Sequence, residues 1–223
     1  MFPVMMIVRD RPLDAATPRK AGRDVRRAQL IDATIAVLAR KGYAALTVAD
    51  VAKEAGLSAG IVIFHFTSKD ELLAAVLHAL ATEYHRHWAG RVRQAGPSAA
   101  ERLKALLLSD FDTSVFTPER LAAWIAFWGE TQGRPVYDQI CSGLDAERQA
   151  ASEILCRELV VEGGYALDPH LLMRTLEALC DGLWLGLAAR GAGNSDRVTA
   201  SDAHKIIMAA LAALFPRHFA PGA

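Results

Sequence analysis

The chain has 223 residues, of which 52% are hydrophobic, and its 25 Lys and Arg are balanced by 25 Asp and Glu. This length and apolar content are enough for a packed core, which excludes a chain that is disordered throughout. The longest apolar runs, such as Leu183 to Ala189, fall far short of the roughly 20 residues of a membrane-spanning helix, which excludes an integral membrane protein and predicts a soluble, cytoplasmic one.

The N-terminal segment, residues 1–22, is predicted to be a flexible arm. It opens with an apolar stretch, but three charged residues follow directly at positions 9–11 and no small-residue cleavage site is present, so it does not resemble a signal peptide. From Arg23 onward, apolar residues recur at helical spacing, and Gly42 is placed to end this first helix as a left-handed residue.

Two short helices joined by a tight turn are predicted next. Thr47 is a suitable N-cap for the second helix, Gly56 permits a sharp turn, and Ser58 can cap a third helix of residues 59–64. In a helix-turn-helix unit of this kind, the second helix of the pair enters the major groove of DNA. We therefore assign residues 23–68 to a DNA-binding domain.

The remaining helices are predicted to form a second, larger domain of residues 69–216, followed by a short tail, 217–223. Ser68 can cap a long fourth helix, which Gly96 and Pro97 end. Further helical patterns cover 98–115, 118–131, 134–162, 168–190 and 199–215. No segment alternates like a strand, so the predicted fold is all-α: a three-helix DNA-binding domain and a C-terminal helical bundle, with about nine helices altogether.

Charge is distributed unevenly between the two predicted domains. Residues 1–93 hold 14 Lys and Arg against 9 Asp and Glu, whereas residues 94–223 hold 11 against 16. A basic N-terminal part favours attraction to a polyanion such as DNA, and the acidic remainder is compatible with a cationic ligand.

The helix-turn-helix segment resembles the DNA-binding signature of the TetR family of bacterial repressors. The resemblance rests on several elements in one frame: Gly42-Tyr43, Leu46 to Ala52, Ala55 to Ser58, Gly60, Phe66, Ser68-Lys69 and Leu72-Leu73. It implies a regulator that binds operator DNA. The chain departs from the usual pattern in carrying Ile63 where a phosphate-binding tyrosine is common, and His65 where a tyrosine often precedes the phenylalanine.

The predicted DNA contacts lie in and around the third helix. Small residues at its start would let the backbone approach the duplex, while hydroxyl, imidazole and ammonium groups nearby can donate to phosphate oxygens. The residues are Arg26, Thr47, Ser58, Ala59, Gly60, Ile61, Ile63, Phe64, His65, Thr67 and Lys69. The alternative is a simple packing unit, with Lys69 a solvated helix start and His65 a surface histidine.

Aromatic and acidic residues in the second domain form a candidate ligand site. Trp124, Phe127 and Trp128 are spaced to share one helix face, and Asp181 lies about one turn from Trp184. These segments resemble the choline-responsive BetI branch of the same family, which implies a cationic effector such as choline or another amine. Aromatic faces beside a carboxylate are the physical requirement for holding such a cation.

Three polar residues, Asp110, Glu130 and Tyr137, are secondary candidates for the same ligand site. Two alternatives to a cation site stay open. The aromatic residues can be plain core, or the effector can be apolar or aromatic, as in a repressor of an efflux or catabolic operon.

The last two predicted helices indicate self-association. They are rich in Leu, Ile, Met and Ala, and so apolar a surface at a chain end usually needs a partner. In the TetR family such helices form a dimer interface, which implies a homodimer on a palindromic operator. Ligand binding would then move the fourth helix, and the DNA-binding domain attached to it, out of register with the DNA.

Two other function classes are an enzyme and a DNA-binding protein without an effector. The sequence contains no serine-hydrolase, metalloprotease, phosphate-loop or dinucleotide motif, so no enzyme, catalytic residue or cofactor is predicted. His85 and His87 are too closely spaced to share a helix face, and the cysteines Cys141, Cys156 and Cys180 are too far apart for a zinc cluster, so no metal site is predicted. A helix-turn-helix activator or architectural protein without an effector is the third class.

Overall fold

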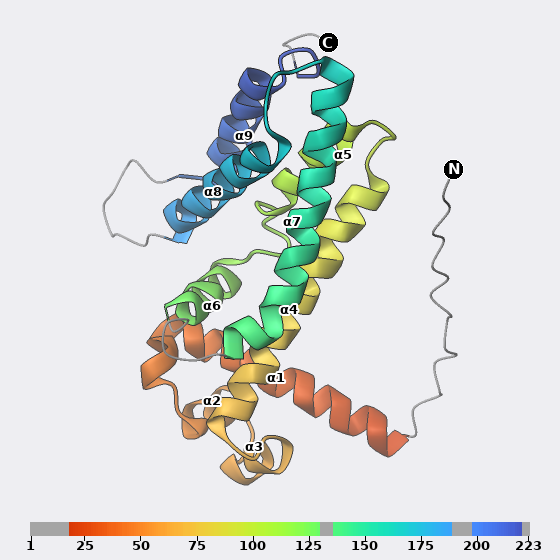
Figure 1. Ribbon diagram of the computed structural model, residues 1–223. Coiled ribbons are helices and arrows are strands. Elements are labelled where there is room, and N and C mark those ends of the chain that lie inside the picture. The colour runs from red at the N-terminus through yellow and green to blue at the C-terminus, as the bar shows by residue number, and fades with distance from the viewer. Residues whose placement is uncertain (1–17, 130–135, 189–197, 220–223) are drawn as a thin grey trace.

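The computed structural model describes residues 18–129, 136–188 and 198–219, and within these ranges the chain forms nine helices and no strand (Figure 1). This confirms the all-α prediction. The helices are α1 (Pro18–Ala45), α2 (Val48–Glu54), α3 (Ala59–His65), α4 (Lys69–Gln94), α5 (Ala99–Ser109), α6 (Pro118–Trp128), α7 (Val136–Gly163), α8 (Pro169–Ala188) and α9 (Ala200–Leu214).

The first three helices form a compact reading head at one end of the molecule (Figure 1). Helix α1 begins at Pro18 rather than at Arg23, so the last residues of the predicted arm are helical; the rest of that arm lies outside the described residues. Gly42 has a φ of 74°, which breaks the helical backbone as its predicted role requires. Gly56, with a φ of 66°, makes the turn between α2 and α3.

The predicted N-caps of the reading head differ in their outcome. Thr47 forms a full capping box with Asp50, in which each side chain bonds the other's backbone N–H. Ser68 likewise accepts from the Glu71 N–H at the start of α4. Ser58 occupies the N-cap position of α3, but its side chain makes no capping hydrogen bond. The prediction that the Ser58 side chain caps the free backbone N–H groups at the start of α3 is therefore wrong.

Helices α4 and α7 run along the length of the molecule and join the reading head to the opposite end, where α8 and α9 lie (Figure 1). Helix α6 packs along α1 and also contacts α8, which places it between the reading head and the C-terminal helices. The second domain is therefore connected to the reading head both through the chain, by α4, and through packing, by α6.

Helix α5 ends at Ser109, earlier than the predicted limit at residue 115. The chain then turns: the carboxylate of Asp112 accepts hydrogen bonds from the backbone N–H and the hydroxyl of Ser114 at 3.0 and 2.6 Å. Such a side chain competes with the helix for backbone donors and favours a turn. As a result, Phe116 folds back against Trp184 with ring centroids 5.0 Å apart.

The core is continuous from the reading head into the bundle and is made mainly of leucine, valine and aromatic side chains. The three cysteines are buried and unbonded, and burial raises the pKa of the Cys141 and Cys156 thiols to about 12. Buried thiols with raised pKa values are chemically inert. None of the helices in the described ranges has the length and hydropathy to span a membrane.

Candidate functional site

The reading head presents most of the predicted DNA-contacting residues to solvent. Arg26, Thr47, Ser58, Ala59, Gly60, Ile63, Phe64 and Thr67 are exposed, and Ile61 and Lys69 are half-buried. Two basic residues of α1 lie beside α3: the Arg23 guanidinium stands 5.7 Å from the centre of the Phe64 ring, and Arg27 donates to the His65 carbonyl at 3.2 Å. The surface thus combines cations from α1 with the outer face of α3.

His65 differs from the other predicted contacts because its side chain is buried. Burial lowers the pKa of its imidazole, and the neighbouring cations of Arg23 and Arg27 lower it further, so the ring is neutral at physiological pH. The structure thus places His65 within the reading head, where a neutral, buried ring is poorly suited to binding phosphate.

Lys69 is held by the reading head itself. Its ammonium donates to the carbonyl oxygens of Tyr43 and Ala44, at 3.2 and 3.4 Å, near the end of α1. The lysine therefore connects the first turn of α4 to the end of α1, a role that sequence pattern alone does not predict.

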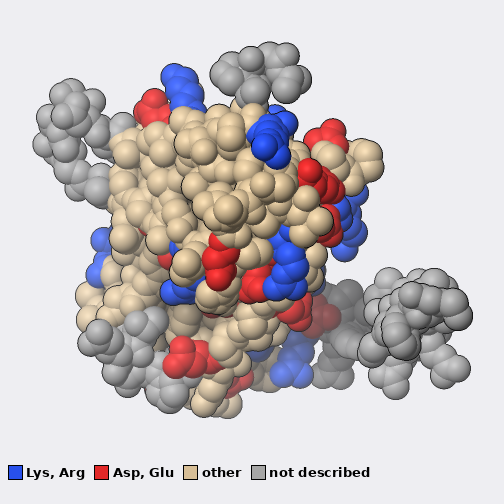
Figure 2. Space-filling view, turned by 45° about the horizontal axis from the view of Figure 1, so that its top comes forward, with Lys and Arg blue, Asp and Glu red and all other residues tan. Residues whose placement is uncertain are grey.

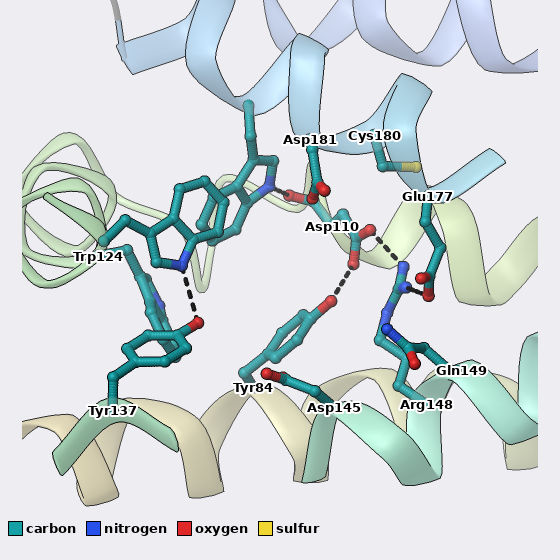
Figure 3. Close-up of a pocket in the computed structure, with 12 residues that line it drawn as sticks. Tyr84, Asp110, Trp124, Tyr137, Asp145, Arg148, Gln149, Glu177, Cys180 and Asp181 are labelled. Atoms are coloured by element: carbon teal, nitrogen blue, oxygen red, sulfur yellow. Dashed lines mark hydrogen bonds and ion pairs between the residues drawn. The ribbon is translucent and has the colours of Figure 1, made fainter. Parts of the chain in front are cut away.

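The second domain encloses a cavity of about 280 Å³ between α4, α5, α6, α7 and α8 (Figure 3). Of the eight candidate ligand-binding residues, six line it: Asp110, Trp124, Trp128, Tyr137, Asp181 and Trp184. Phe127 is absent from the lining and packs in the core, and Glu130 lies outside the described residues. The cavity therefore gathers residues that are far apart in the sequence.

Three indole rings and two phenols form the aromatic part of the lining. The Trp128 and Trp184 rings have centroids 5.5 Å apart, and Trp124 meets Trp184 at 6.3 Å. Hydrogen bonds fix the rings: the Trp128 indole N–H donates to the Tyr137 hydroxyl at 2.8 Å, and that of Trp184 donates to the Asp110 carbonyl at 2.8 Å (Figure 3). Tyr84 of α4 completes the aromatic lining.

A buried guanidinium organises the polar side of the cavity. Arg148 of α7 forms ion pairs with Asp110 at 2.6 Å and with Glu177 at 3.0 Å, and Asp110 also accepts from the Tyr84 hydroxyl at 2.9 Å (Figure 3). Burial alone would lower the pKa of Arg148, but Asp110 and the other acidic neighbours raise it overall. The guanidinium is therefore a permanent charge that ties α4, α5, α7 and α8 together.

Two further carboxylates, Asp145 of α7 and Asp181 of α8, line the cavity and make no hydrogen bond or ion pair with any residue that the structure describes. With Asp110 and Glu177, they give the lining four carboxylates against one guanidinium. Desolvation in the cavity raises the pKa of both Asp145 and Asp181. The site has an excess of negative charge beside a set of aromatic faces.

Several lining residues escape prediction because they come from α7 and α8 positions that resemble ordinary solvent-facing ones. Asp145, Arg148, Gln149 and Glu177 belong to polar stretches of long amphipathic helices. Tyr84 likewise lies in a polar stretch of α4, directly before His85. Tyr137, by contrast, is one of the secondary candidates that the sequence offers.

A second cavity, of about 180 Å³, adjoins the first and shares Asp110 and Trp184 with it. Its other lining residues are mostly apolar and come from the 111–116 turn, α6 and the α8 and α9 ends: Phe111, Thr113, Phe116, Pro118, Leu121, Ala122, Leu187, Ala188 and Ala200. Trp184 thus stands between an acidic cavity and an apolar one.

Comparison with known families matches two parts of the chain. Residues 30–76 match the bacterial regulatory proteins of the tetR family, and residues 99–216 match the C-terminal domain of BetI-type transcriptional repressors. The chain is 34% identical over 177 residues to the HTH-type transcriptional regulator BetI of Paraburkholderia phymatum, a match that covers 78% of this chain and 87% of that protein.

Solved structures with the same fold include two transcriptional regulators. A transcriptional regulator from Pseudomonas aeruginosa PAO1 superposes with a TM-score of 0.72 at 32% identity, covering 88% of this chain and 94% of that one. A transcriptional regulator from Saccharomonospora viridis, crystallised in complex with choline, superposes with a TM-score of 0.73 at 19% identity, covering 84% and 96%.

Proposed function

Since the chain belongs to the TetR family and carries the C-terminal domain of BetI-type transcriptional repressors, we propose that it binds a palindromic operator as a homodimer and releases it when an organic cation fills the cavity. The members of this family are transcriptional regulators and not enzymes. One observation supports a cationic effector: three indole faces line the same cavity as two carboxylates that have no described hydrogen-bond or ion-pair partner.

The chemistry of the cavity suits a quaternary or protonated amine. A cation is attracted to the faces of Trp124, Trp128 and Trp184 by their quadrupoles, and this attraction is stronger where water is excluded. Asp145 and Asp181 supply the opposite charge that a desolvated cation needs. The choline bound by the Saccharomonospora viridis regulator belongs to the same chemical class.

Helix α6 offers the route by which an occupied cavity would act on DNA binding. Trp124 and Trp128 of this helix face the cavity, while Phe127 on another side contacts Tyr43 of the reading head at 5.7 Å between ring centroids. A ligand that repositions α6 would therefore displace α1 and, through it, α3. Ligand and operator would then oppose each other reciprocally, as linkage requires.

The outer faces of α8 and α9 support the homodimer. Leu171, Ala178, Gly182 and Leu185 are exposed along one stripe of α8, with Ile206 exposed on α9. Figure 2 shows few charged side chains over the part of the surface where these helices lie. A second copy on this face would bury the stripe and set two reading heads at a fixed separation, as a palindromic operator needs.

The decisive experiment compares choline with 3,3-dimethylbutanol, its uncharged carbon isostere, in titrations of the full-length protein followed by tryptophan fluorescence and by retention of operator DNA. Three of the four tryptophans line the cavity, so occupancy should change the emission. We expect organic cations to quench the emission saturably and release DNA, while the isostere does neither. Trp88, which packs on His85 outside the cavity lining, provides a control: Trp88→Phe should leave the response intact.

The second candidate, an apolar or aromatic effector, is favoured by the adjoining apolar cavity. This candidate would be supported, and the cationic effector excluded, by equal responses to choline and its isostere or by a response only to uncharged aromatic compounds. DNA binding that no small molecule alters would leave a regulator without the proposed effector control.

A further inference from the structure

The largest apolar side chains that the reading head leaves in solvent include two neighbours on α3. Ile63 is 59% exposed and Phe64 is 71% exposed. Neither is needed in the core of the head, which is filled by Val62, Phe66 and other side chains. Exposing two large apolar groups side by side is unfavourable in the free protein, which indicates that a partner covers them.

The outer face of α3 carries no hydrogen-bonding side chain. Its seven residues are Ala59 to His65, and His65, the only polar one, is buried. Direct readout of a base through donors and acceptors is therefore not available to the side chains of this helix. The apolar feature that a major groove offers is the 5-methyl group of thymine, and phenylalanine and small apolar side chains are known to contact it.

Gly60 keeps this face flat. A Cβ added there would meet nothing closer than the Ser58 hydroxyl oxygen, at 3.8 Å, and the backbone φ is not in the left-handed region. No contact inside the protein therefore requires a glycine at this position. A surface that must approach the edges of base pairs closely does benefit from one.

The charges around the face match the same occupant. Arg23 stands beside the Phe64 ring at 5.7 Å from its centre, and Arg26 is exposed on the same helix α1. Cations beside an apolar strip can bind the phosphate backbone that borders a major groove. The cations would supply affinity for DNA of any sequence, and the apolar strip would supply the preference for one base sequence over another.

We propose that α3 reads its operator half-site through the 5-methyl groups of thymines, which contact Ile63 and Phe64. This inference rests on the proposed function, because it assigns the base-reading residues of the operator contact. It predicts thymine at one or more positions of each half-site, and it predicts that the methyl group, rather than the hydrogen-bonding edge of the base, carries the preference.

The test uses duplexes that the full-length protein selects from a random-sequence DNA pool, resynthesised with deoxyuridine in place of each thymidine in turn. Deoxyuridine keeps every donor and acceptor and removes only the methyl group. Burying one methyl corresponds to roughly a fourfold change in affinity, so we expect binding to weaken about three- to fivefold at each contacted position. Phe64→Ala should abolish this difference at one position and Ile63→Ala at another.

Two control variants separate the outcomes. Val161→Ala, at an exposed position of α7, should retain the full response to deoxyuridine, and Arg23→Ala should weaken both kinds of duplex equally. Wild-type protein that binds selected duplexes with the same affinity whether they carry thymine or uracil would overturn this inference and leave the regulator standing. A protein that selects no sequence from the pool would instead overturn the proposed operator binding.

Discussion

Tyr43 of α1 and Phe127 of α6 meet edge to face, with their ring centroids 5.7 Å apart and their planes at 77°. Both side chains are buried. Phe127 lies between Trp124 and Trp128 in the sequence, so this contact joins the cavity helix directly to the reading head. It also accounts for the one predicted ligand residue in the described chain that does not reach the cavity.

Removing the ring contact between Tyr43 and Phe127 should weaken the coupling between effector binding and DNA binding. Phe127→Leu keeps an apolar side chain and should lower the free energy of unfolding by about 1 kcal/mol. The affinity for the effector should change little, whereas the effector concentration needed for half-release of DNA should rise about 2- to 30-fold, because residues that transmit coupling contribute roughly 0.5–2 kcal/mol. Parallel fluorescence and DNA-retention titrations measure the two quantities separately.

Phe215→Leu is the matched control, since Phe215 is fully buried against Tyr165 near the C-terminal end of the bundle. It should lower the free energy of unfolding by a similar amount. The ratio of the effector concentration for half-release of DNA to the dissociation constant of the effector should stay unchanged. If Phe127→Leu also leaves that ratio unchanged, α6 does not transmit the signal through Tyr43.

Arg148 should be essential for the stability of the second domain. Its removal in Arg148→Ala leaves Asp110 buried without its ion-pair partner, and breaking a buried pair in this way costs about 3–5 kcal/mol. Urea denaturation of the free protein measures the loss. Arg157→Ala removes an ion pair with Glu153 on the exposed side of the same helix and should cost less than about 1 kcal/mol. Equal losses in the two variants would mean that the network around Arg148 has no special role.

Features of this structure that depend on neighbouring residues can be predicted from the sequence, whereas features that depend on contacts between distant residues cannot. Helices α1 to α9 could be located because capping residues and helical spacing are local signals. The end of α5 was misplaced because Phe111, Val115 and Phe116 continue an apolar pattern, while a single carboxylate, Asp112, turns the chain.

The candidate site could be predicted only in part, for a related reason. The aromatic residues of α6 and α8 stand out in any sequence, but the spacing of Trp124, Phe127 and Trp128 does not tell which ring faces a cavity and which faces a neighbouring helix. Arg148 follows Glu147 on a polar stretch and reads as a surface residue. Its burial depends on Asp110 and Glu177, which arrive from two other helices.

The α8 and α9 face should carry the dimer. Leu185→Glu would place a charge on an exposed apolar stripe, where it costs nothing in a free monomer but is desolvated in an interface. We expect sedimentation velocity to show a monomer and operator affinity to fall at least tenfold. Val25→Glu, an equally exposed apolar position on α1 at the far end of the molecule (Figure 1), should remain dimeric. A dimeric Leu185→Glu protein would place the interface elsewhere.

Effector binding should weaken as the pH falls, because Asp145 and Asp181 must be ionised to hold a cation. Desolvation raises the pKa of both carboxyls above the ordinary value of 3.8, although Arg148 acts in the opposite direction on each and Arg174 also on Asp181. Protonation therefore begins at a higher pH than for an exposed aspartate. Below the raised values, affinity should fall by up to about tenfold per pH unit for each proton that the cation must displace.

The free protein should show the opposite dependence. Since the folded-state pKa values are raised, the native state binds more protons than the unfolded state between those values and 3.8, so these two groups add stability as the pH falls through that window. The double variant Asp145→Asn with Asp181→Asn should flatten both trends and lower cation affinity at neutral pH. Asp138→Asn, at an exposed position of the same α7, should change neither. Cation affinity in the double variant that equals the wild-type value at pH 7 would show that these carboxylates do not hold the effector.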